Sequence, residues 1–154
     1  MKSFGVLLGA AALMDLGCSA SMAQTAEPSA AARAMIDNVV IAVKADRDKA
    51  LDMFNEGKGG FYIKERDIFP FCFSMSDGKI IATQTKQALG KDLRTFKDPT
   101  GKAFGQEIYD LVKEGQIAEV SYAFARPGDD QIPAPKASFV TRIADLGCGV
   151  GYYK

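Results

Sequence analysis

The chain has 154 residues, which is enough for one domain with a buried core and too few for two. Its 19 lysine and arginine residues balance its 19 aspartate and glutamate residues, and the two signs are interleaved along the chain. This pattern argues against a nucleic-acid-binding face and against a polybasic membrane-binding segment. The sequence contains no histidine, the commonest general base and metal ligand, so we expect neither an enzyme nor a metal site.

The N-terminal residues have the pattern of a signal peptide covering residues 1–23. Lys2 gives a positive start, residues 4–16 are mostly apolar, and small residues at 21–23 place the cleavage after Ala23. The apolar run is shorter than the roughly 20 residues of a membrane-spanning helix, so we expect a periplasmic or secreted protein without stable membrane insertion. An alternative makes Cys18 a lipid-modified first residue. Asp15 argues against it, because that signal has an aliphatic residue three positions before the cysteine.

Two helices are predicted after a linker at residues 24–30. The first covers about residues 31–44 and places Ile36, Val40 and Val43 at helical spacing. The second begins at a cap, Asp46 or Asp48, and ends in the turn-forming sequence NEGKGG. Two helices therefore precede the first strand.

The rest of the chain reads mainly as strands. A hairpin follows residue 68, with its turn at SDGK, and Pro70 is expected at a bulge or an unpaired point because it has no amide to donate. A third helix begins at Phe104 and stops at Gly115. Three strands complete the chain, at residues 117–125, 136–143 and 147–153. These elements predict an α+β fold, with a five-stranded antiparallel sheet, a long N-terminal helix and further helices packed on one side.

Glycines alternate along the last strand, at positions 147, 149 and 151, and leave one of its faces without side chains. Either a helix or a small ligand must approach this face closely, and we favour the N-terminal helix. Neither GCGVG nor NEGKGGF has the context or spacing of a nucleotide-binding glycine motif, so no cofactor is expected.

The segment from Tyr122 to Ser138 carries the candidate binding residues. Arg126 and Lys136 lie near the two ends of a proline-rich loop and supply cations, while Tyr122 and Ser138 supply hydroxyl groups. A small carboxylate in an apolar pocket needs such a cation and a few converging donors. The predicted apolar wall consists of Phe71, Phe73 and Phe124. In the competing interpretation, Arg126 and Lys136 are solvent-facing charges paired with Asp129 and Asp130.

Two cysteines, Cys72 and Cys148, remain after the predicted cleavage, in a compartment that oxidises thiols. Either they form a disulfide or they stay as separate buried apolar side chains. The residues alone leave both alternatives open.

An ordered set of segments resembles the single Cache domain family of extracytoplasmic sensor modules, and covers about residues 31–154. These segments are DKALDMFNEGKGGF, DGKI, GKDL, KDPTGKAFGQEI, VSYAF, PAPKASFV and GVGYYK. The resemblance implies a PAS-like sheet of order 2-1-5-4-3 and a pocket for small organic acids such as acetate, propionate, pyruvate or lactate. In that order the first and last strands are neighbours, which favours the Cys72–Cys148 disulfide.

Two positions match the residues that the family uses for ligands. Lys136 corresponds to the lysine of a Pro-Lys-x-Ser-Tyr run, and Tyr122 to a tyrosine of the preceding strand. Phe139 replaces the usual tyrosine of that run and removes a hydroxyl group. Family members are commonly flanked by transmembrane helices and followed by a signalling domain, and neither is expected here.

Together, these features predict a non-enzymatic, exported sensor that binds a small carboxylate and acts through a separate partner, such as a membrane receptor or another exported protein. The alternative is a protein–protein interaction module whose pocket is filled by its own phenylalanines, at positions 71, 73, 124 and 139.

Overall fold

The computed structural model describes residues 27–128 and 132–154. The predicted signal peptide, the cleavage site after Ala23 and Cys18 lie outside the described residues, as do Asp129 and Asp130.

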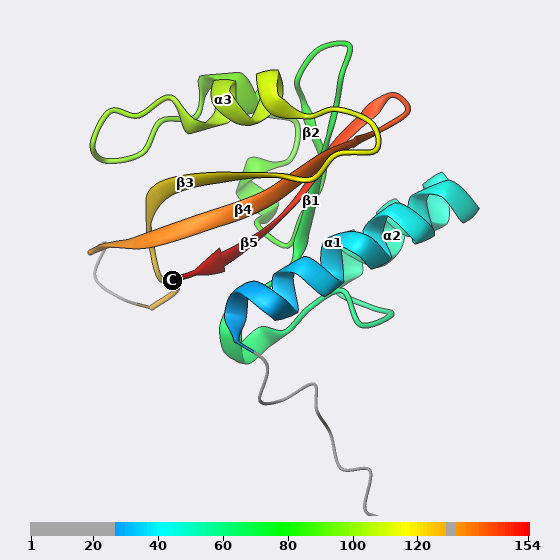
Figure 1. Ribbon diagram of the computed structural model, residues 1–154, viewed down its shortest axis with the longest axis horizontal. Helices are drawn as coiled ribbons and strands as arrows, with labels where there is room; N and C mark the ends of the chain where they lie inside the picture. The colour runs from blue at the N-terminus through cyan, green and yellow to red at the C-terminus, as the bar shows by residue number, and fades with distance from the viewer. Residues whose placement is uncertain (1–26, 129–131) are drawn as a thin grey trace, which may run out of the picture.

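A five-stranded antiparallel sheet forms the centre of the domain (Figure 1). Its strands are β1 (Pro70–Ser74), β2 (Ile80–Ala82), β3 (Ala118–Ala125), β4 (Pro133–Ile143) and β5 (Leu146–Tyr153). Their order in the sheet is β2-β1-β5-β4-β3, as the resemblance implied. The last strand therefore lies in the middle, and every residue of β5 is buried.

Helices cover both faces of this sheet, so the prediction that they pack on one side was wrong (Figure 1). Helices α1 (Pro28–Ala45) and α2 (Arg47–Glu56) lie on one face, and α3 (Phe104–Leu111) lies on the other. Helix α1 begins three residues before the predicted boundary, with Pro28 in its first turn, where proline leaves no hydrogen bond unmade. No helix within the described ranges is long and apolar enough to cross a membrane.

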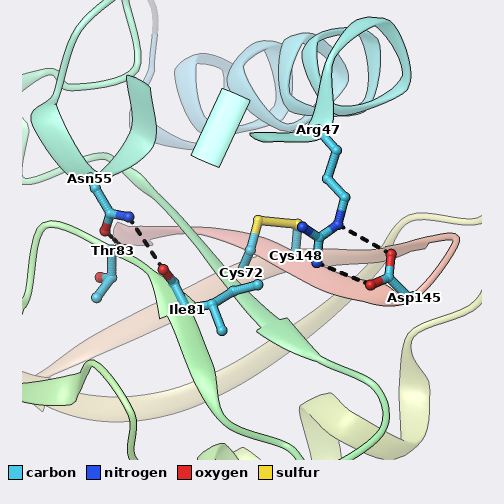
Figure 2. Close-up of a disulfide and its surroundings, with 7 residues drawn as sticks. All are labelled: Arg47, Asn55, Cys72, Ile81, Thr83, Asp145 and Cys148. Carbon is cyan, nitrogen blue, oxygen red and sulfur yellow. Dashed lines mark hydrogen bonds and ion pairs between the residues drawn. A yellow bond between two sulfur atoms is a disulfide. The ribbon is translucent and has the colours of Figure 1, made fainter. Parts of the chain in front are cut away.

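Local signals fix the ends of α2 as expected. The Asp46 side chain accepts a hydrogen bond from the Lys49 amide and caps the helix, and Gly57 ends it in the left-handed conformation. Side-chain contacts at both ends then hold α2 to the rest of the domain (Figure 2). Arg47 Nη2 lies 3.0 Å from an oxygen of Asp145 in the β4–β5 turn, and Asn55 donates to the Ile81 carbonyl at 3.2 Å.

A disulfide joins Cys72 of β1 to Cys148 of β5, on the face that α1 and α2 cover (Figure 2). The two residues lie directly opposite each other in the β1–β5 register, and both are fully buried. The same face buries Val150 and Tyr152 of β5 against Ile36 and other residues of α1.

The glycines of β5 point to the other face, so the prediction that α1 packs on them was wrong. Phenylalanine rings of β1 occupy the space instead. A Cβ atom at Gly147 would lie 2.1 Å from Phe73 Cζ, and one at Gly149 would lie 2.5 Å from Phe71 Cζ. The missing side chains let these rings lie flat on the sheet.

The prolines lie at the ends of strands. Pro70 is the first residue of β1 and has no partner on β2, as the predicted unpaired point requires; the register irregularity falls later, between Cys72 and Phe73. Strand β4 already begins at Pro133, not at Lys136. The β4–β5 register ends at Lys136, beyond which the Lys154 amide donates to the Pro135 carbonyl at 3.0 Å. Pro133 and Ala134 pair only with β3 and form a local sheet edge, where proline is tolerated.

One buried aspartate, Asp98, ties the loop before α3 to strand β3. Its carboxylate accepts hydrogen bonds from the Thr100 hydroxyl at 2.6 Å, the Thr100 and Lys102 amides, and the Ala123 amide at 3.0 Å. These bonds, led by the Thr100 hydroxyl, lower the pKa of Asp98 to about 2. Ala123 lies between two candidate pocket residues, so this contact helps to position them.

The low pKa predicts an acid-dependent loss of stability. Asp98 stabilises the fold fully above its ordinary pKa of 3.8 and loses this contribution as the pH falls through about 2. We expect Asp98→Asn to be less stable than the wild type at pH 5, and the difference to shrink as the pH approaches 2. Urea unfolding of both proteins across this range measures it. A difference that stays constant with pH would contradict this role.

Candidate functional site

The site is centred on Lys136, which lies on the sheet face opposite α1. In the strand register Lys136 pairs with Tyr122 of β3 on one side and with Tyr153 of β5 on the other. Its side chain is buried, with 9% of its surface exposed. A Cβ atom at Gly151 would lie 3.0 Å from Lys136 Cε, so the third glycine of β5 makes room for the lysine.

Aromatic rings surround the Lys136 ammonium group. Its Nζ atom lies 4.3 Å from the ring centre of Tyr153, 5.3 Å from that of Phe124 and 6.0 Å from that of Phe69. Such rings attract a cation through their negative faces. They also exclude water, so the ammonium is held in an apolar setting.

One carboxylate, Asp67, completes these surroundings. Its Oδ2 atom lies 3.6 Å from Lys136 Nζ, longer than the roughly 2.7–2.9 Å of a close charge-assisted hydrogen bond. An ammonium group has three donors, so this single loose contact leaves it the capacity to bind a ligand. Asp67 was missed at the sequence level, because nothing in ERDIF distinguishes it from an ordinary turn aspartate.

Burial governs the electrostatics of this pair. Loss of solvent lowers the pKa of Lys136, and Asp67 opposes this effect, while the nearby charge of Arg126 lowers the pKa further. The same loss of solvent raises the pKa of Asp67, and Lys136 opposes it. For both residues, the cost of burying the charge exceeds the attraction between them. The ammonium therefore gains from a further anionic partner.

Tyr122 and Ser138 form a hydrogen-bonded pair beside the lysine, with their oxygens 2.8 Å apart. The Tyr122 ring stacks on Phe104 of α3, with centres 4.3 Å apart and planes 7° from parallel. Burial raises the pKa of Tyr122 to about 12, so its hydroxyl stays protonated and can donate. Ser138 is fully buried and contributes through Tyr122.

A cavity of about 100 Å³ adjoins Lys136. Its walls come from both sheet and loops, and are mostly apolar: Phe69, Phe71, Ile80, Thr83, Thr85, Ala88, Leu93, Phe96, Phe104, Tyr122, Phe124 and Lys136. A second hollow of about 250 Å³ shares Lys136, Phe69 and Phe124 with it and also includes Asp67. We call the first cavity the chamber; Lys136 lies where the chamber meets the second hollow.

The structure brings together most of the predicted site residues, but not all of them. Lys136, Tyr122, Phe71 and Phe124 line the cavity. Arg126 is exposed, lies outside the cavity and stacks on Tyr153, with its guanidinium carbon 4.4 Å from the ring centre.

Two phenylalanines have roles other than those expected. Phe73 does not line the cavity, because its ring is buried against Gly147. Phe139 lies on the opposite face of the sheet, stacked on Tyr152, so its missing hydroxyl does not alter the pocket. The alternative, in which four phenylalanines fill the pocket, therefore fails at these two positions, since only Phe71 and Phe124 of the four line the cavity.

The residues that could bind a metal ion do not gather into a metal site in the part of the chain that the structure describes. That part holds no group of three or more histidine, cysteine, aspartate or glutamate residues arranged to bind a metal ion. The chamber has the features of a site for a small organic anion: one cation, one neutral donor and apolar walls.

Comparisons with solved structures show the same fold. The chain is 22% identical to a periplasmic sensor domain of a chemotaxis protein, with TM-score 0.58, covering 80% of this chain and 88% of that one. It is 20% identical to a methyl-accepting chemotaxis protein from Vibrio parahaemolyticus RIMD 2210633, with TM-score 0.63 and coverages of 81% and 87%. A Cache chemosensory domain, studied for carboxylic acid recognition, is 23% identical, with TM-score 0.56 and coverages of 79% and 85%.

The comparison with protein families is the decisive one. No curated protein matches the chain. A family model described as a Cache domain matches residues 47–154, which include every strand of the sheet and all the residues around Lys136. The chain therefore belongs to the Cache domain family.

Proposed function

We propose that this domain binds a small monocarboxylic acid outside the cytoplasm and reports its presence to a separate partner protein, without chemical turnover. The observation that carries the proposal is the buried ammonium of Lys136 at the edge of an apolar cavity. Burying a cation is costly unless an anion meets it, and Asp67 meets it only loosely. A ligand carboxylate supplies the missing partner.

The volume of the cavity limits the size of the ligand. About 100 Å³ corresponds to the liquid volume of about three water molecules, at roughly 30 Å³ each. This space accommodates the short chain of a C2 to C4 acid, such as acetate, propionate, pyruvate or lactate. The carboxylate then lies at Lys136, and the chain points between Phe71 and Phe104.

Tyr122 provides the second polar contact in this proposal. When Ser138 donates its proton to the Tyr122 oxygen, the phenol proton becomes free to bond a ligand oxygen. Arg126 stays outside the chamber and adds positive charge near its opening. A related solved domain is described in terms of carboxylic acid recognition, which supports this choice of ligand class.

A thermal-shift screen with C2 to C4 acids tests the proposal. A ligand that binds only the folded state stabilises it by about 2.7 kcal/mol at 100 times its Kd, which raises Tm by several degrees. We expect this shift in the wild type and its loss in Lys136→Met, which keeps the length of the side chain without its charge. The exposed Lys97→Met provides the matched control and should keep the shift.

Two results would contradict the proposal. One is the absence of any shift with millimolar acid. The other is an equal shift in the wild type and in Lys136→Met, because the acid would then bind elsewhere. Turnover of a bound acid by the purified protein would overturn the non-enzymatic role.

A further inference from the structure

We propose that Asp67 makes acid binding proton-linked: the site takes up a small carboxylate together with one proton, which the ligand and Asp67 share beside Lys136. The inference rests on the proposed function and adds a specificity-determining residue to it. No bond of the ligand is made or broken, and the proton comes from the solvent.

The argument begins with the charges in the chamber. Among the described residues that line the cavity, Lys136 is the only lysine or arginine. The carboxylate of Asp67 already lies 3.6 Å from its Nζ atom. An arriving ligand carboxylate would place two anions around one buried ammonium. Two carboxylates that share a site cannot both remain ionised cheaply, and one of them gains a proton.

The Asp67 carboxylate cannot move away from Lys136 when a ligand binds, because the backbone is held by hydrogen bonds on both sides of Asp67. Ile63 and Ile68 exchange backbone hydrogen bonds at 2.9 and 3.2 Å, and Ile68 is fully buried. The short 3-10 turn η2 (Lys64–Arg66) lies between them, and the Asp67 amide bonds back to the Lys64 carbonyl. An aspartate side chain has little reach of its own, so its carboxylate stays close to Lys136.

The other charged and titratable groups around Asp67 come from its own segment and from two strands. Its own segment contributes Tyr62, Lys64, Glu65 and Arg66, strand β3 contributes Tyr122 and leads into Arg126, and β5 contributes Tyr153. Lys64, Arg66 and Arg126 line a hollow of about 240 Å³ that Asp67 also lines. Besides burial, the charge of Arg126 lowers the pKa of Lys136, but burial still outweighs the cation beside Asp67 and raises the pKa of Asp67. None of these three cations lines the cavity, so Lys136 stays the cation that the ligand carboxylate meets.

The ligand-free site is already biased towards protonation. Burial raises the pKa of Asp67 even with Lys136 beside it. A second carboxylate raises this pKa further, so proton uptake on binding follows from the same electrostatics.

Calorimetric titration with sodium propionate, and with acetate alongside, provides the test. Between pH 6 and 8 both acids are ionised, so their own titration does not contribute. If one proton is taken up, Kd rises about tenfold for each unit of pH. Titration in two buffers with different ionisation enthalpies should give about one proton bound per propionate.

Asp67→Asn is the informative variant, because asparagine tolerates the left-handed backbone of this residue, whose φ is 53°. It removes the competing charge. We expect propionate to bind Asp67→Asn more tightly than the wild type at pH 8, with little pH dependence and no proton uptake. The exposed Asp52→Asn serves as the matched control and should keep the wild-type slope.

The outcomes separate this inference from the proposed function. Equal propionate affinity at pH 6 and pH 8 without proton uptake would overturn the role of Asp67 and leave acid binding intact. Tighter binding of alanine than of propionate, without proton uptake, would also overturn it, because Asp67 would then pair with a ligand ammonium group. If neither acid binds the wild type or Asp67→Asn, both proposals fail.

Discussion

Removal of the Cys72–Cys148 disulfide is expected to lower the free energy of unfolding by about 4 kcal/mol. The disulfide joins residues 76 positions apart, so it restricts a large part of the unfolded chain. A loop of this length gives the disulfide an entropic effect near the upper end of the usual range. Because small domains have a total stability of roughly 5–15 kcal/mol, the loss would be a large fraction of it.

The measurement is urea unfolding of the wild type and of the Cys72→Ala/Cys148→Ala variant, each with and without reductant. Reductant should lower the midpoint of the wild type and leave that of the variant unchanged. Both cysteines are fully buried between the sheet and the two N-terminal helices, so each alanine also leaves a small cavity. Comparison of the reduced wild type with the variant separates this packing loss from the loss of the disulfide. Coincident unfolding curves for the oxidised and reduced wild type would show that the disulfide contributes no stability.

The elements of the fold could be predicted wherever local signals are strong. The sequence predicted the α2 cap at Asp46 or Asp48, the end of α2 in NEGKGG, and strands from their period-two alternation. The structure has the cap at Asp46 and the end at Gly57. The side of the sheet on which each helix packs was not predictable in this way. Because β5 is buried on both faces, the alternation of its glycines does not show which of the two faces meets α1.

The residues of the candidate site were likewise predictable where they lie in strands and not predictable elsewhere. Alternation along β3 and β4 placed Tyr122, Lys136 and Ser138 on one face, and the structure brings them together. Asp67 lies in no strand. Its place beside the site follows from the register in which β1 pairs with β5 and β5 with β4. Pro70 pairs with Val150, so the residues before β1 run alongside the end of β5, where Tyr153 pairs with Lys136. Strand register depends on contacts between distant segments, which a single sequence does not show.

A single added methyl group at Gly147 is the second large effect that we expect. In an open position, replacing glycine by alanine stabilises a protein by about 0.4–1 kcal/mol, because it restricts the unfolded chain. At Gly147 the new Cβ would lie 2.1, 2.5 and 2.8 Å from three atoms of the Phe73 ring. That ring is fully buried and is held from the other side by Tyr109, with ring centres 5.9 Å apart. Because the overlap forces this buried ring or the strand to shift, Gly147→Ala should cost about 1–3 kcal/mol.

The sign of this effect should reverse once the ring is removed. Phe73→Ala alone should cost about 3–5 kcal/mol, because it leaves a cavity in the core. In that background the methyl group at residue 147 meets open space, so Gly147→Ala should be neutral or stabilise the protein by up to about 1 kcal/mol. A double-mutant cycle measured by urea unfolding gives the coupling between the two positions directly. An equal cost of Gly147→Ala in both backgrounds would mean that the glycine is required by the strand itself and not by the ring that lies on it.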